Sequence, residues 1–155
     1  MRVAAPVLAL VALVAIGSAE SVESARELAA LPGRGRPTLG GGGAALTLAG
    51  LLLSIGVYAA LGWAIATWTA RESVAVRTGA VVGVGAGLIG GTIRAFAVSD
   101  YLDATVRAYG LPVDLATIAL AIFVALAMIA SALGGAGLTW LSFRSARKRS
   151  PRPRS

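Results

Sequence analysis

Residues 85–90 read Gly-Ala-Gly-Leu-Ile-Gly and match the G-x-G-x-x-G pattern of a dinucleotide-binding turn. In that pattern the glycines bring a phosphate against the N-terminus of a helix. The fold that uses the pattern also needs repeated strand–helix units and an acidic residue about 20 positions further along. Here long apolar runs flank the glycines, and the next acidic residue, Asp100, follows Gly85 after only fifteen positions. We therefore expect no nucleotide cofactor, and we expect these glycines to serve helix packing.

The glycines belong to a longer pattern in which every fourth residue between positions 75 and 99 is small. Its members are Ala75, Gly79, Gly83, Gly87, Gly91, Ala95 and Ser99. Positions four apart lie almost above one another on a helix, and faces of small residues let membrane helices approach closely. We predict a glycine zipper at Gly79, Gly83, Gly87, Gly91 and Ala95. Its partner is helix 44–70 or helix 115–143 of the same chain, or a second copy of the chain.

Cysteine and histidine are both absent from the chain. This excludes disulfides, thiol nucleophiles, imidazole bases and the usual zinc ligands. With no other catalytic pattern present, we expect a non-enzymatic protein without a metal or cofactor.

Arg94 is the only ionisable residue within an expected membrane span, 78–99. An arginine in the middle of a membrane helix costs about 2.5–3.5 kcal/mol on insertion scales, so such residues are candidates for function. Arg94 also lies roughly 7.5 Å from the outer end of this span, by helix rise. Its side chain can therefore extend to the lipid headgroups or to Asp100, Asp103 or Asp114. The alternative is a role in anion binding or gating.

The composition is that of an integral membrane protein. Of 155 residues 57% are hydrophobic and 14% charged, with a mean hydropathy of +0.80, whereas soluble domains are about a quarter charged. Four apolar stretches stand out, at 3–19, 44–70, 78–99 and 115–143. We predict an all-α bundle of four transmembrane helices, or three if residues 1–19 are a cleaved signal peptide. Short interfacial helices are expected to accompany it.

The segments between the apolar stretches complete the predicted organisation. Residues 20–43 form an external amphipathic segment and a glycine-rich linker, and residues 44–143 form a three-helix transmembrane core. A short surface helix is expected within the core between Ser99 and Gly110, because Ser99 or Asp100 can cap its start and Pro112 prevents its continuation. Residues 144–155 form a basic cytoplasmic tail.

Six of the fourteen basic residues follow Phe143, which by the positive-inside rule places the C-terminus in the cytoplasm. With four spans the N-terminus is cytoplasmic too. The tail residues Arg144, Arg147, Lys148 and Arg149 are predicted to contact anionic lipid headgroups. We expect no nucleic-acid partner, although 34–37 resemble the core of an AT-hook, because the topology places them outside. The richness in Ala, Gly and Arg suggests a bacterial inner-membrane protein.

Two classes of function remain. The first is a structural or accessory membrane subunit, whose partners are the lipid bilayer and a second copy or another membrane protein. The second is a small transporter, pore or holin-like protein. The size resembles that of small multidrug exporters, whose first span carries an embedded glutamate. We expect no acid in any span of this chain, which puts proton-coupled cation export in doubt.

Overall fold

The computed structural model describes residues 3–29, 42–112 and 114–149. They form four helices: α1 (Ala4–Ala29), α2 (Gly42–Trp68), α3 (Glu72–Ala108) and α4 (Asp114–Arg149). All four are long and apolar enough to cross a membrane, as the sequence predicts. Residues 30–41, which hold most of the predicted glycine-rich linker, and 150–155 at the end of the predicted tail lie outside the described residues, whereas Gly42 and Gly43, predicted as linker, begin α2.

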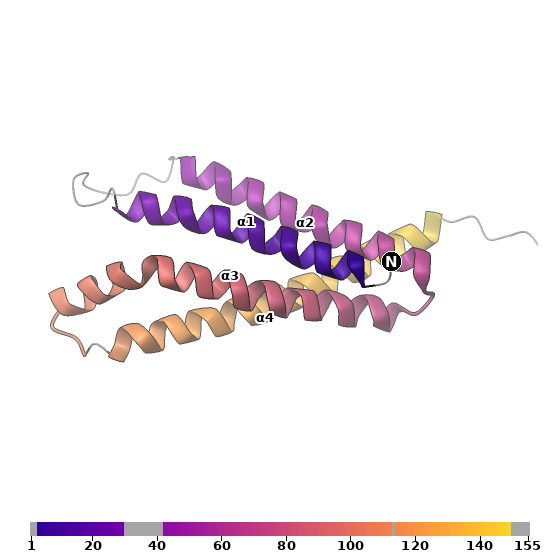
Figure 1. Cartoon of the computed structure of the whole chain (residues 1–155). Coiled ribbons are helices and arrows are strands. Elements are labelled where there is room, and N and C mark those ends of the chain that lie inside the picture. The colour runs from indigo at the N-terminus through magenta and orange to yellow at the C-terminus, as the bar shows by residue number, and fades with distance from the viewer. Residues whose placement is uncertain (1–2, 30–41, 113, 150–155) are drawn as a thin grey trace, which may run out of the picture.

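The helices form two hairpins, α1–α2 and α3–α4, that converge at one end and diverge toward the other (Figure 1). α3 and α4 pack against each other most extensively, and α4 crosses to reach α2. α1 contacts α2 and α3, but within the described residues it does not contact α4. We call the converging end, which holds Arg71 and the end of α4, the basic end, and the end with Asp100 and Asp114 the acidic end.

The buried core lies mainly in the half of the bundle toward the basic end. Its largest side chains come from α2 and α4, namely Tyr58, Leu61, Ile65 and Phe143. Leu13 of α1 and Val82 of α3 join them. Toward the acidic end the hairpins separate, so fewer large side chains fill the centre.

The helices extend beyond the predicted spans. The expected surface helix after Ser99 is instead the last part of α3, which has 37 residues. The Ser99 hydroxyl donates to the carbonyl of Phe96 at 2.8 Å, so it bonds within the helix and does not cap a new one. α4 likewise continues through Gly134 and Gly135 into the predicted tail, as far as Arg149. The residues between the spans contain few helix breakers, so the helices run on.

The connection between α3 and α4 matches the predicted stop signal. α3 ends just before Gly110, which adopts φ 65°, a conformation that glycine reaches without a steric cost. The Leu111 N–H then donates to the carbonyl of Val106 at 3.0 Å. Pro112 follows, and α4 starts at Asp114.

Candidate functional site

The small residues of α3 lie at its contact with α4. Ala75, Gly79, Gly83, Gly87, Gly91 and Ala95 are all buried. A Cβ on Gly83 would overlap the Ser131 carbonyl oxygen, and one on Gly87 would lie 2.7 Å from the Met128 Cα. At Gly91 the fit is looser, since the nearest atom, the Ala127 Cβ, is 3.2 Å away. Within the chain, Gly83, Gly87 and Gly91 therefore face helix 115–143 and not helix 44–70.

α2 approaches α4 closely only toward the basic end. A Cβ on Gly62 would overlap the Thr139 carbonyl oxygen and lie 2.9 Å from the Ser142 Cβ. One helical turn nearer the acidic end, the Tyr58 ring covers Gly135, whose Cβ position is 2.8 Å from Cε1 of the ring. Beyond Tyr58 the two helices separate, which leaves space in the middle of the bundle.

That space is a cavity of about 350 Å³ lined by residues of all four helices. Most of its wall is apolar. Its polar lining residues are Glu20, Ser21, Thr47, Ser54, Tyr58, Arg94 and Ser131. The cavity thus holds one acid, one base and several hydroxyl groups at the centre of an otherwise apolar bundle.

Glu20 corrects the expectation that no acid lies in a span. The segment of α1 that is apolar and long enough to cross a membrane runs from Ala4 to Val22 and includes Glu20. The sequence pattern ended this span at Ala19, but α1 continues because the hydroxyls that could break it bond within the helix. Ser18 donates to the Val14 carbonyl at 2.8 Å, and Ser21 to that of Gly17 at 2.7 Å.

The Glu20 carboxylate points toward α2 and lies against Gly50. A Cβ on Gly50 would overlap Oε1 of Glu20 and lie 2.6 Å from its Cδ. Glycine at position 50 is therefore what lets the carboxylate occupy this place. The sequence offered a weak signal for this contact, because small residues also recur on α2 at Gly50 and Ser54.

Arg94 also lines the cavity and is half-buried there. Arg94 therefore lies inside the bundle and lines the same cavity as Glu20. It also lies near the acidic end, as the sequence predicts. Arg94 has an interaction partner of its own. Neither its predicted contact with headgroups nor its alternative role in anion binding is tested by this placement.

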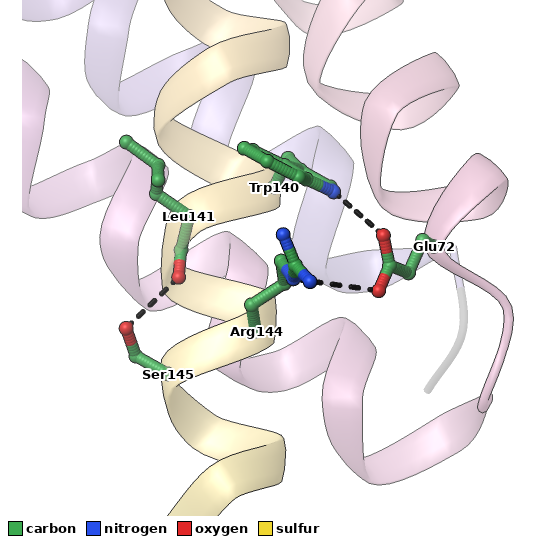
Figure 2. Close-up of polar contacts among 5 residues, drawn as sticks. All are labelled: Glu72, Trp140, Leu141, Arg144 and Ser145. Carbon is green, nitrogen blue, oxygen red and sulfur yellow. Dashed lines mark hydrogen bonds and ion pairs between the residues drawn. The ribbon is translucent and has the colours of Figure 1, made fainter.

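At the basic end, Glu72 joins the start of α3 to α4 (Figure 2). The Trp140 indole N–H donates to Oε2 of Glu72 at 2.8 Å, and Arg144 Nε lies 3.5 Å from Oε1. The Arg144 guanidinium also stacks 4.8 Å from the centre of the Trp140 ring. Arg144, which we predicted to contact lipid, therefore has a protein partner as well.

The other predicted headgroup contacts lie further along α4. Arg147, Lys148 and Arg149 are exposed in its last turn, and the Arg149 guanidinium lies 5.8 Å from the centre of the Trp63 ring. Arg149 of α4 and Trp63 of α2 thus meet across two helices, whereas Arg144 and Trp140 both belong to α4. Whether these cations bind headgroups stays a prediction.

Among residues 3–29, 42–112 and 114–149, no group of three His, Cys, Asp or Glu side chains could hold a metal ion. Comparison of the chain with protein-family models, with curated proteins and with solved structures found no match. Its function is therefore inferred from its own residues.

Proposed function

We propose that this chain spans a membrane with its four helices and binds a small solute in the central cavity, as a small transporter does. It catalyses no covalent reaction in this proposal. The observation that carries the proposal is the cavity of about 350 Å³, lined from all four helices and holding both Glu20 and Arg94. The size is within the usual range of about 300–1,000 Å³ for small-molecule pockets.

The location of the charges supports a solute pathway over a purely structural role. Ionisable side chains inside membrane bundles are costly and usually line a pathway or a polar cavity. The expectation of a structural subunit rested on the lack of any polar cluster in the spans, and Glu20 and Arg94 supply one. The cavity also lies where the two hairpins diverge, a place where a change in their angle would alter access to it.

A structural or accessory subunit is the second candidate, favoured by the backbone contact between α3 and α4. Helices that pack through Gly79, Gly83 and Gly87 form a rigid pair, and a glycine zipper of this kind also stabilises contacts between chains. Such a subunit would bind a second copy of the chain or another membrane protein. For either candidate we propose a bacterial inner-membrane protein with the basic end, and so both termini, in the cytoplasm.

Flux through proteoliposomes separates the two candidates. The solutes are benzyltrimethylammonium, phenylalanine and benzenesulfonate, which carry a similar apolar group and different charges. Ser54→Phe would fill the cavity, whereas Ile55→Phe places the same side chain at the neighbouring exposed position. We expect saturable uptake of at least one solute with the unmodified chain and with Ile55→Phe, and its loss with Ser54→Phe. Uptake no faster than in protein-free liposomes would contradict the transporter and favour the structural subunit.

A further inference from the structure

We infer that the cavity accepts a small organic cation with an apolar body, and that the Glu20 carboxylate binds the positive charge of this ligand. The inference rests on the proposed function, because it names the class of solute that the cavity holds. It depends on three features of the described residues: the surroundings of Glu20, those of Arg94, and the wall between them.

Glu20 has a carboxylate whose charge is not balanced. Among residues 3–29, 42–112 and 114–149, no hydrogen bond or ion pair involves this side chain. It is half-buried, lines the cavity and packs against Gly50. A carboxylate removed from water without a partner is unfavourable, so a cation in contact with it is stabilised.

Arg94 lines the same cavity and has an interaction of its own. Glu20, in contrast, has no hydrogen bond or ion pair among the described residues, so its carboxylate is the lining charge with which a ligand cation pairs. The Arg94 guanidinium still repels a cation at a distance. We consequently expect a ligand with a single positive charge, held near Glu20.

The rest of the wall suits an apolar body. Leu13, Ile16 and Leu51 contribute aliphatic side chains, and Tyr58 and Phe123 contribute aromatic rings. Aromatic rings attract cations to their faces, most strongly where water is scarce. A ligand that combines an ammonium group with an apolar body satisfies both parts of the wall. A strongly hydrated inorganic cation satisfies only the carboxylate.

Equilibrium dialysis of the purified full chain in an uncharged detergent tests the inference, with protein-free micelles as the blank. The probes are benzyltrimethylammonium and benzenesulfonate. We expect saturable binding of the cation only. Glu20→Gln, which keeps the shape of the side chain, should weaken it by about tenfold or more. Asp100→Asn removes the same charge at an exposed position outside the cavity and should leave binding unchanged.

Thermal unfolding in the same detergent verifies that the variants are folded, and Glu20→Asp, which keeps the charge, should bind with intermediate affinity. Cation binding that survives Glu20→Gln, or stronger binding of benzenesulfonate, would overturn the inference while leaving a transporter possible. If the unmodified chain binds the cation but takes up no solute faster than protein-free liposomes do, the proposed function is contradicted instead. The two failures are thus distinguishable.

Discussion

Gly79 of α3 and Gly135 of α4 lie backbone against backbone. A Cβ on Gly79 would overlap the Gly135 carbonyl oxygen, and a Cβ on Gly135 would lie 2.5 Å from the Gly79 carbonyl oxygen. The contact is reciprocal, and neither obstructing atom belongs to a flexible side chain. A methyl group at either position therefore requires the helices to move apart.

Gly135→Ala should lower the free energy of unfolding by about 1–3 kcal/mol, because the added methyl meets backbone and the Tyr58 ring. Gly134→Ala is the matched control, since its Cβ would have nothing within 4 Å. That variant should be neutral or more stable, as alanine favours helix over glycine. Denaturant unfolding in mixed micelles measures both. Equal stability of the two variants would show that α3 and α4 do not pack as described.

Gly50→Ala should weaken cation binding without lowering stability. The added methyl meets only the far end of the Glu20 side chain, which can rotate away at little cost, but the carboxylate then leaves its place. Gly56→Ala is the control on the same helix, because its Cβ would have open space. Dialysis with benzyltrimethylammonium and thermal unfolding are measured on both variants. If Gly50→Ala bound the cation as well as the unmodified chain, the position of Glu20 against Gly50 would not be needed for ligand binding.

Arg94→Gln should bind benzyltrimethylammonium more tightly, by about threefold or more, because a positive charge facing the cavity is removed. Arg107→Gln removes an exposed charge near the end of α3 and should have little effect. Affinity is measured by dialysis at constant ionic strength. If Arg94→Gln bound the cation more weakly than Arg107→Gln, Arg94 would help to bind the ligand. That result would favour a ligand that also carries a negative charge.

The ion pair between Glu72 and Arg144 should contribute little to stability. Both side chains are about half exposed, at 52% and 50%, and exposed pairs contribute less than about 1 kcal/mol. A double-mutant cycle of Glu72→Gln and Arg144→Gln, followed by unfolding, gives the coupling energy. We expect it to fall further as salt is added. A coupling energy well above this value, or one insensitive to salt, would indicate that the basic end is less hydrated than described.

Single cysteines test the orientation, since the chain has none of its own. Ser145→Cys lies exposed near the basic end, and Tyr109→Cys lies exposed at the opposite end of the bundle. In intact cells a membrane-impermeant maleimide should label Tyr109→Cys and reach Ser145→Cys only after the membrane is opened. The reverse pattern would invert the proposed topology.

The sequence predicted where the four long apolar helices lie, although it left open whether the first is a cleaved signal peptide and it expected short helices beside them. Long apolar runs must form helices in a low-dielectric setting, and Gly110 with Pro112 marks a stop that no neighbour can override. The fourfold spacing of small residues also limited which face of α3 could pack closely. Helix ends were less predictable, because Ser99, which was expected to cap a new helix, bonds within α3 instead.

The tertiary structure alone decided what lies in the centre of the bundle. Glu20 and Arg94 are 74 positions apart; the sequence pattern placed Glu20 just beyond one span and Arg94 inside another, near its outer end. They face one cavity because α1 continues past Ala19 and because the hairpins diverge beyond Tyr58. Periodicity along one helix cannot contain this information, because the angle between hairpins depends on side chains and backbone meeting across all four helices.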